Sequence, residues 1–355
     1  MSIIDRYIVR TILGSVLMVV CVLLILGALL TFIAQQDDIG TGRYTTLGAL
    51  WYTALNLPLL AFEILPIAGL IGALLGLGSL ARGSELTVVR ATGMSIARLA
   101  GTVLIAGVIL VAIGVLLGEF VGPRLQQTAR EQKAFAKLNN VAFGGGAGAW
   151  VRDGDLILHV AGQSGESQFA GMQIFELSPQ HRLLALGHAG SASVWSKGKW
   201  LLGDYRESRF QGDTVTKSDL GQRILESNVT ANFLGLAVQN PEELTNRALW
   251  RLISYYRTNS LSDKEYVFAF WSRIARTVGI AFSVLLAIPF VLGSLRSAGA
   301  GARMLMGLIL GIAFFLLQRL IASGTVVFNL DPVVLAWLPT ALLAVVTLGL
   351  LARAR

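Results

Sequence analysis

The sequence is short of charge, cysteine and histidine. Charged residues make up 14% of its 355 residues and hydrophobic residues 54%, whereas soluble domains average about 25% charged residues. This shortage excludes an ordinary soluble protein and predicts a membrane protein with a polar insert. The single cysteine, Cys21, excludes an intramolecular disulfide. The net charge of +8 does not predict nucleic-acid binding, because many arginines flank apolar runs, where they orient helices.

Sequence motifs for a metal site, a catalytic nucleophile or a phosphate-binding loop are also missing. His159, His181 and His188 show no metal-ligand spacing with an acidic or cysteine partner, so we expect no metal site. The segment 162–166 begins like a nucleophile elbow but lacks its final glycine. The glycine-rich run 144–148 is not followed by Gly-Lys-Ser/Thr, so it is not a phosphate-binding P-loop. We therefore expect neither an enzyme nor a cofactor, and energy for active transport would have to come from another subunit.

Long apolar runs predict six transmembrane helices, three before a polar region and three after it. The expected spans are 11–36, 57–81, 99–118, 276–295, 304–322 and 332–352. Each is about as long as a helix that crosses a hydrocarbon core of about 30 Å. The first is too long for the core of a signal peptide, so we expect it to be retained. In the second, Pro58 and Pro66 would bend the helix, and Glu63 is expected near the outer interface as a solvated carboxylate.

The polar region alternates short apolar bursts with turn signals. The bursts are 149–151, 156–160, 172–175, 183–186, 193–195 and 200–202. Turn signals such as Asp153-Gly154 and Lys197-Gly198 separate them. Short strands at this spacing predict an antiparallel β sandwich or jelly roll over about 149–236.

The expected fold is therefore an α-helical membrane protein (three spans plus three) with an inserted antiparallel β jelly-roll domain. Its parts would be 1–123 with the first three spans, 124–265 with the β domain, and 266–355 with the last three spans. Asn240-Pro241 predicts the start of a helix after the β domain. A capping box at 262–265 precedes the fourth span.

The distribution of charge in the short loops predicts the orientation. Arginines gather on one side of the spans: Arg6, Arg10, Arg82, Arg90, Arg98, Arg296, Arg303, Arg353 and Arg355. The loops on the other side hold mainly aspartates: Asp37, Asp38 and Asp331, with Arg43. The positive-inside rule then places both termini in the cytosol and the β domain on the opposite side.

A short polar stretch, 82–93, lies between the second and third spans. Ser84 is a suitable N-cap, and Glu85 suits the positive end of a helix dipole. Gly93 can adopt the left-handed conformation that ends a helix. The stretch therefore predicts a helix of about two turns within 84–93.

On this short helix an apolar strip borders charge, because Leu86, Val89 and Arg90 fall at i, i+3 and i+4. Two interpretations stay open. The helix is either a turn that joins two spans, or a coupling helix on the cytosolic face that a partner protein pushes.

Several short motifs, taken in order along the chain, resemble the lipopolysaccharide-export permeases of the LptF/LptG family. They are Asp-Arg-Tyr-Ile at 5–8, Leu-Leu-Gly-Leu-Gly at 74–78, Ser-Glu-Leu at 84–86, Gly-Glu-Phe-Val-Gly-Pro at 118–123, Trp-Ser-Arg at 271–273 and Leu-Gly-Ser-Leu-Arg-Ser at 292–297. Each motif alone is weak, but their order and spacing together are specific. The resemblance covers the whole chain, and the opening tetrapeptide is more similar to LptG members than to LptF members.

The resemblance implies an inner-membrane complex of this chain with an LptF-type permease, an LptB-type ATPase dimer and an LptC-type bridge protein. Such a complex takes lipopolysaccharide from the periplasmic leaflet and passes it along a bridge of jelly rolls. ATP and magnesium would bind to the ATPase. In this family the segment after the second span docks in a groove of the ATPase, which assigns that coupling to Ser84, Glu85, Leu86, Val89 and Arg90. Glu85 would be the acidic residue near the start of the docked segment.

One feature departs from the family pattern. LptG members can carry lysines just outside the first span, proposed to meet substrate phosphates, but this chain has Gln-Gln-Asp-Asp at 35–38. Arg319 lies roughly 24 Å along its span from Arg303, at 1.5 Å per residue, toward the phosphates of lipid A. Arg130 and Lys133, three residues apart, would share one helix face. Substrate contact, snorkelling and pairing with another subunit stay open for Arg319, as does a plain solvated face for Arg130 and Lys133.

Two other functions remain open. A permease of the same architecture would move another lipid or a lipoprotein, because lipid specificity rests on the shape of a cavity. A membrane-anchored periplasmic hydrolase is the alternative from another class, and the missing catalytic constellation counts against it. Co-purification of an ATPase subunit and bound lipid A would favour export, whereas a lone chain that cleaves its substrate would favour the hydrolase.

Overall fold

A computed structural model describes residues 2–137, 149–165, 168–178, 182–196, 199–211, 214–227, 241, 244–259, 261–293, 299–324 and 330–353. Several positions used above lie outside these ranges: His181, the run 144–148, Asn240, Arg296 and Arg355. The chain divides into two compact units. The helical unit comprises Met1–Ala34, Thr53–Gln126 and Lys264–Arg355. The β-containing unit comprises Gln35–Tyr52 and Gln127–Asp263.

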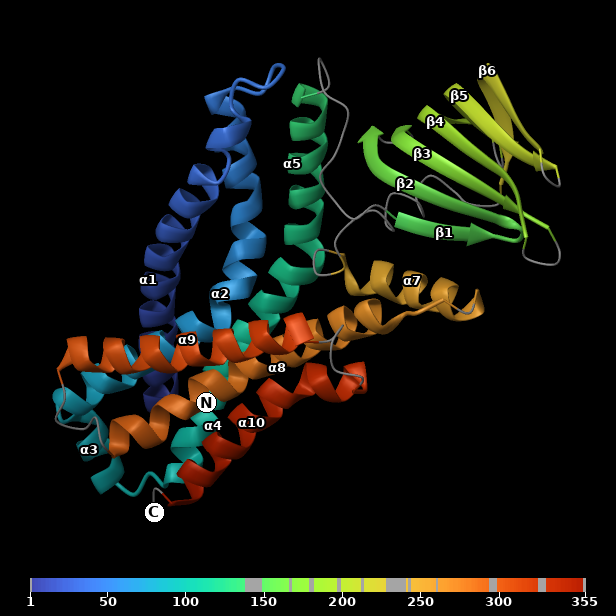
Figure 1. Cartoon of the computed structure of the whole chain (residues 1–355). Coiled ribbons are helices and arrows are strands. Elements are labelled where there is room, and N and C mark those ends of the chain that lie inside the picture. Colours follow the sequence, from blue (N-terminus) through green and yellow to red (C-terminus); the bar gives the residue numbers. More distant parts are fainter. Residues whose placement is uncertain are drawn as a thin grey trace. The chain divides into compact units, whose positions relative to one another are not determined.

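Long helices account for most of the described residues outside the sheet (Figure 1). They are α1 (Ile3–Ile33), α2 (Thr46–Arg82), α4 (Ile96–Val115), α5 (Gly122–Lys137), α8 (Lys264–Leu292), α9 (Ala300–Gly324) and α10 (Pro332–Arg353). A π-helical turn, η2 (Leu116–Val121), joins α4 to α5. Five of the described helices are long and apolar enough to cross a membrane, and α9 contains a shorter apolar stretch, Leu305–Ile321. The predicted membrane architecture is thus confirmed, and the fifth expected span corresponds to the apolar stretch of α9.

Tight contact between α1 and α2 organises the core of the helical unit. A Cβ added to Gly72 would lie 2.5 Å from Cα of Val16, and one added to Gly76 would lie 3.2 Å from Cα of Ile12. Glycine is needed at these two positions because the helix backbones approach so closely. Buried side chains of α3 (Glu85–Ala91), α4 and α8 complete the same core: Leu86, Leu99, Val103, Ile280 and Val284.

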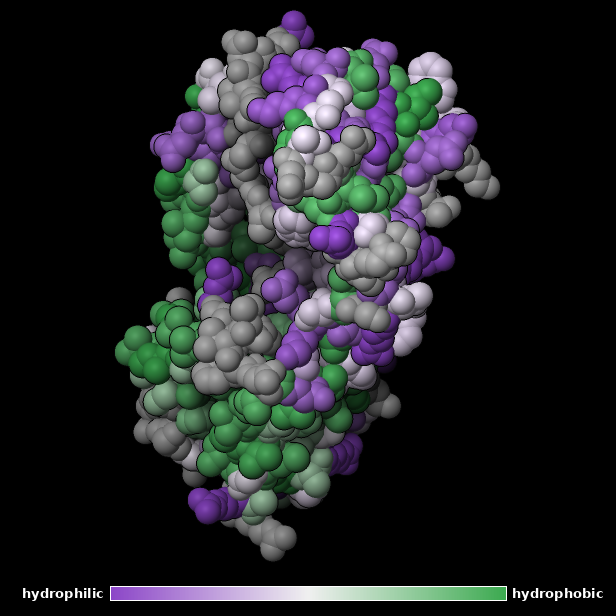
Figure 2. Space-filling model, turned by 45° about the vertical axis from the view of Figure 1, so that its right-hand side comes forward, coloured by the Kyte–Doolittle hydropathy of each residue, from purple (hydrophilic) through white to green (hydrophobic). Residues whose placement is uncertain are grey.

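The outer surface of these helices is apolar, as expected for helices that face lipid. Large side chains of α1 point outward, among them Leu17 (64% exposed), Met18 (66%) and Ile25 (73%). On the face that Figure 2 draws, hydrophobic residues gather over the helices at its lower end. Soluble proteins rarely expose contiguous apolar patches of more than a few hundred Å². The surface of the helical unit therefore agrees with the membrane class predicted from composition.

The described strands of the β-containing unit form one antiparallel sheet in the order β1-β2-β3-β4-β5-β6 (Figure 1). The strands are β1 (Ala149–Asp153), β2 (Leu156–Gly165), β3 (Gln168–Leu177), β4 (Leu183–Ser196), β5 (Lys199–Gln211) and β6 (Thr214–Glu226). Asp153 pairs with Leu156 across the β1–β2 turn, where Gly154 has a φ of +60°. Alternate residues such as Leu158, Val160 and Met172 are buried on one face. The predicted antiparallel β domain is confirmed.

Strand β4 joins two bursts that the sequence pattern separates, 183–186 and 193–195. The intervening small residues allow Tyr205 and Asp204 of β5 to lie against the strand. A Cβ added to Gly187 would meet the Tyr205 hydroxyl at 2.3 Å, and one added to Gly190 would meet Cβ of Asp204 at 3.2 Å. The gap in the apolar pattern is therefore a packing site and not a turn.

One predicted helix start lies largely outside the described residues, and one predicted cap makes no hydrogen bond. Helix α7 (Asn246–Thr258) begins after Thr245, whose side chain accepts a hydrogen bond from the Ala248 amide at 3.2 Å, whereas Asn240, the predicted N-cap, is not among the described residues. At the start of α3 (Glu85–Ala91), Ser84 has a φ of +61° and its side chain makes no capping hydrogen bond. A serine at the N-cap position caps a helix only if its backbone conformation lets the side chain reach the first amides. Here the chain leaves α2 just before Ser84, and the positive φ of Ser84 accompanies the missing bond. Gly93, with a φ of +97°, does take the left-handed conformation expected after this helix.

Candidate functional site

Helix α3 carries most of the predicted coupling residues, some of them buried and some exposed. Leu86 is buried (4% exposed) in the core shared with α1, α2 and α4, and Val89 packs partly against that core. Glu85 and Arg90, which border this apolar strip, are exposed. A helix of seven residues whose apolar strip is anchored and whose charges face outward can transmit a push to the helices that hold it. The expected apolar strip bordered by charge is thus present.

Arg130 and Lys133 of α5 lie together at one tyrosine. The Lys133 ammonium is 5.0 Å from the centre of the Tyr52 ring, and the Arg130 side chain hydrogen-bonds to the Tyr52 hydroxyl. The i, i+3 spacing therefore puts both cations on one helix face, as expected. Lys133 also pairs with Asp38, at 2.6 Å between Nζ and Oδ2, and donates a hydrogen bond to Gln35. Its charge is thus balanced by the segment that departs from the family pattern.

Arg319 lies near the C-terminal end of α9, in the helical unit. Its side chain is exposed, between Leu316 (52% exposed) and Leu320 (70%). It therefore faces outward from this chain, among side chains suited to lipid or to another membrane helix.

An ion pair inside the helical unit was not predicted. Arg273 of α8 is 8% exposed and lies 3.6 Å from the Glu119 carboxylate, measured from Nη1 to Oε2. Its guanidinium also lies 6.0 Å from the centre of the Phe62 ring. Glu119 is carried by the π-helical turn η2, and such turns frequently occur at functional sites. The available signal was one charge of each sign within an apolar region, in two of the motifs that resemble the family.

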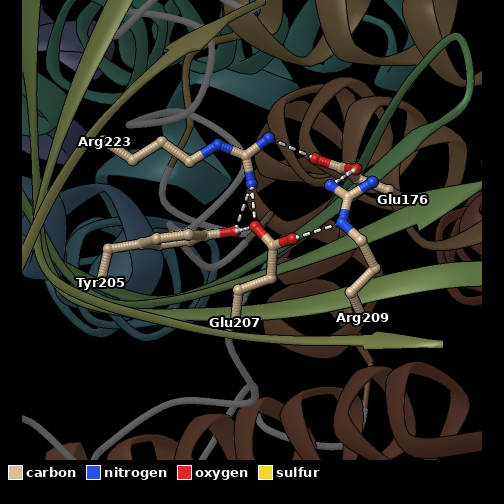
Figure 3. Close-up of polar contacts among 5 residues, drawn as sticks. All are labelled: Glu176, Tyr205, Glu207, Arg209 and Arg223. Atoms are coloured by element: carbon tan, nitrogen blue, oxygen red, sulfur yellow. Dashed lines mark hydrogen bonds and ion pairs between the residues drawn. The ribbon is translucent and has the colours of Figure 1, made fainter. Parts of the chain in front are cut away.

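The β sheet contains a second polar cluster that the sequence does not reveal (Figure 3). Arg223 binds the Glu176 carboxylate at 2.6 Å and also contacts Glu207, and Arg209 Nε donates to Glu207 at 2.9 Å. The Tyr205 hydroxyl donates to Glu207 at 3.0 Å. Burial raises the pKa of Tyr205 to about 12, so its hydroxyl remains protonated. The two arginines balance the two carboxylates, so the cluster joins β3, β5 and β6.

We expect this cluster to make the stability of the sheet dependent on pH. Burial raises the pKa of Glu207, but hydrogen bonds from Tyr205 and Arg209 and the charges of Arg223 and Arg209 outweigh burial, so its pKa is lowered below the ordinary 4.5. The stabilisation is complete above 4.5 and is lost as the pH falls through the lower folded value. Glu207→Gln should lower the free energy of unfolding on the order of 3 kcal/mol at pH 7. Limited proteolysis of the full chain across pH would measure both effects.

The exposed Glu226 of β6 supplies the matched control. Its side chain is 78% exposed and pairs with Lys199 at the surface, so Glu226→Gln should leave the proteolysis rate nearly unchanged. Equal rates for Glu207→Gln and Glu226→Gln would contradict a stabilising role for the cluster.

Among the described residues, no group of three or more His, Cys, Asp or Glu side chains is arranged to hold a metal ion. His159 lies on β2 with its ring 4.5 Å from that of Trp150, where it packs.

Comparison with known proteins agrees with the helices and the β sheet described above. The chain matches the family described as "Lipopolysaccharide export system permease LptF/LptG" over residues 6–353. It belongs to this family. It is 30% identical over 354 residues to the lipopolysaccharide export system permease protein LptG of Escherichia coli strain K12, which covers 99% of this chain and 98% of that protein.

Two further relatives cover most of their own length. LptG of Haemophilus influenzae is 30% identical over 352 residues, 99% of this chain and 98% of that protein. LptF of Escherichia coli strain K12 is 25% identical over 356 residues, 94% of this chain and 90% of that protein. The chain is therefore more similar to these LptG proteins than to this LptF protein, in agreement with its opening motif at 5–8.

Proposed function

We propose that this chain is the LptG-type permease subunit of an ABC transporter that extracts lipopolysaccharide from the bacterial inner membrane. The observation that carries the proposal is 30% identity to LptG over 98% of that protein's length, so that helices and β sheet are matched together. In the proposed complex the chain pairs with an LptF-type permease, an LptB-type ATPase dimer and an LptC-type bridge protein. The ATPase binds ATP and magnesium, and this chain converts its motion into movement of lipid.

The proposed orientation puts both termini in the cytosol and the β sheet in the periplasm. Arginines at the helix ends support it. Arg82 ends α2, Arg98 lies in the first turn of α4, and Arg353 ends α10. Positive charge in short loops is retained on the cytosolic side. The β sheet and the bridge protein would then lie on the same side of the membrane, the periplasmic side, to which the lipid is delivered.

Topology reporters would test this orientation. A reporter fused after Val194, in β4, is expected to score periplasmic, whereas fusions after Ala91 and at the C-terminus should score cytosolic. The alkaline phosphatase and green fluorescent protein pair gives opposite signals on the two sides and so serves as its own control. A cytosolic signal at Val194 would overturn the orientation and the export proposal with it.

Arg319, Arg130 and Lys133 are proposed as contacts for the phosphates of lipid A. Arg319 is supported by its exposed position in an apolar stretch, and the other two by their common place beside Tyr52. A guanidinium binds phosphate oxygens in a bidentate manner that an ammonium cannot match. For Lys133 a phosphate would have to replace the Asp38 carboxylate, so Arg319 and Arg130 carry more of the proposal.

Substitution of Arg319 tests the substrate. Arg319→Gln is expected to lose crosslinking to lipopolysaccharide while the complex still assembles, because the charge is removed but the helix is kept. Arg319→Lys should retain part of the crosslinking, since the charge remains without the bidentate geometry. Photocrosslinking in purified complexes, with co-purification of the other subunits as the measure of assembly, gives both readouts. An Arg319→Gln complex that crosslinks at the parental level would reduce this arginine to a membrane anchor.

A further inference from the structure

Side chains in the first two turns of α1 contact both α3 and α4. The Asp5 carboxylate accepts a hydrogen bond from the Thr102 hydroxyl of α4 at 3.0 Å and lies 3.9 Å from the Arg98 guanidinium. It also accepts one from the Ser2 amide at 2.8 Å, which caps α1 itself. The start of α1 is therefore joined to the start of α4 by a side chain that is fixed in place.

Tyr7 joins the same turns of α1 to α3. Its side chain, half exposed, makes a hydrogen bond with the Glu85 carboxylate. The Glu85 side chain is folded back toward the start of α3, because a Cβ added to Gly83 would lie 3.3 Å from its Oε1. Because a phenol hydroxyl donates to a carboxylate, Tyr7 restrains the position of the Glu85 carboxylate.

A groove lies between these segments. Its volume is about 220 Å³, and its walls include Ile3, Ile4 and Ile8 of α1, Leu80 of α2 and Val89 of α3. Small-molecule sites in proteins usually measure about 300–1,000 Å³. The groove is thus of a size for one or two side chains of another protein. Among the described residues that line the groove, Glu85 is the charged one.

The apolar wall of the groove is not suited to lipid. Ile3, 88% exposed, and Ile4, 40% exposed, precede the exposed Arg6 and Arg10 on α1. In the proposed orientation those arginines lie at the cytosolic headgroups, so the two isoleucines lie on the cytosolic side of them. An apolar surface in that place is stable when another protein covers it.

We propose that this groove extends the surface on which the partner ATPase docks, beyond α3 and onto the first turns of α1. The ATPase inserts an apolar side chain beside a basic group, and the basic group pairs with the exposed Glu85 carboxylate. Tyr7 is a positioning residue, because it presents the Glu85 carboxylate to that group. Motion of the ATPase then reaches α1 directly and reaches α4 through Asp5. This proposal rests on the proposed function, which supplies the ATPase.

Photocrosslinking in the complete complex in membranes tests the docking surface. A photoreactive amino acid at Ile4 is expected to crosslink to the ATPase subunit. Val88, 60% exposed on α3, gives the reference position, and Leu17, 64% exposed on the same helix as Ile4, gives the lipid-facing control. Crosslinks from Val88 but not from Ile4, or crosslinks from Ile4 to lipid, would overturn the extended surface and leave the proposed function intact. Absence of ATPase crosslinks from both Val88 and Ile4 would overturn both proposals.

The role of Tyr7 has a separate test. Tyr7→Phe keeps the ring that lines the groove and removes the hydroxyl, so we expect ATP-driven release of lipopolysaccharide to fall about three- to tenfold with assembly retained. In a Glu85→Ala background the same change should have no further effect, because the carboxylate to be positioned is absent. A merely structural tyrosine would cause an equal loss in both backgrounds. Parental release by Tyr7→Phe, or an equal loss in both backgrounds, would overturn the positioning role.

Discussion

Glu85→Lys is expected to abolish lipopolysaccharide export and to release the ATPase subunit from the complex. Glu85 stands at the positive end of α3, exposed, beside a groove of otherwise apolar lining. A lysine there would repel the basic group that the carboxylate is proposed to bind, and it would oppose the helix dipole. Glu85→Ala removes the attraction without adding repulsion, so we expect a smaller loss, about tenfold. Complementation of a depletion strain and ATPase co-purification measure the two effects.

Thr87→Lys is the control for the lysine that Glu85→Lys introduces. Thr87 is an exposed residue of the same helix, two positions further on and hence on another face. Thr87→Lys adds a lysine to α3 without removing the carboxylate, so export should be retained to a large extent. Full complementation by Glu85→Lys with the ATPase still bound would show that α3 is only a connecting turn.

Arg273→Leu is expected to have the largest effect on stability. Arg273 is 8% exposed and faces Glu119, whose side chain is 22% exposed, inside the helical unit. Removal of one partner leaves the other charge without its ion pair in a low-dielectric region, which typically costs about 3–5 kcal/mol. The double variant Glu119→Leu, Arg273→Leu should recover much of this loss, since an apolar pair of similar size often replaces a buried ion pair at little cost. Thermal stability of the detergent-solubilised complex measures both.

Arg276→Leu is the control on the same helix, three residues further on, where the side chain is half-buried. It removes a like charge that acts on Arg273, so little loss of stability is expected. If the double variant is less stable than either single variant, the two residues do not act as a pair. If it is stable but does not export, the pair serves the movement of α4 against α8 and not only their packing.

The charged groups within the membrane region show which contacts the sequence pattern predicts and which it does not. Glu119 and Arg273 each lie in a motif that resembles the family, yet their pairing depends on how α8 packs against α4 and its π-helical turn. The tie from Asp5 to Thr102 likewise joins residues 97 positions apart. Sequence spacing predicts which residues share a face of one helix, as for Arg130 and Lys133, but it does not predict which faces of two helices meet.

The sequence by itself determined the membrane class, the three-plus-three arrangement of helices, the antiparallel β insert and the place of α3. These features follow from local causes: the length of apolar runs, turn residues at regular intervals and a glycine able to adopt positive φ. The tertiary structure decided that the Ser84 side chain makes no capping hydrogen bond, that β4 continues through Gly187 beneath Tyr205, and that Tyr7 holds Glu85. Each of these depends on which distant side chains share a packed volume, and that choice is made by the whole fold and not by neighbouring residues.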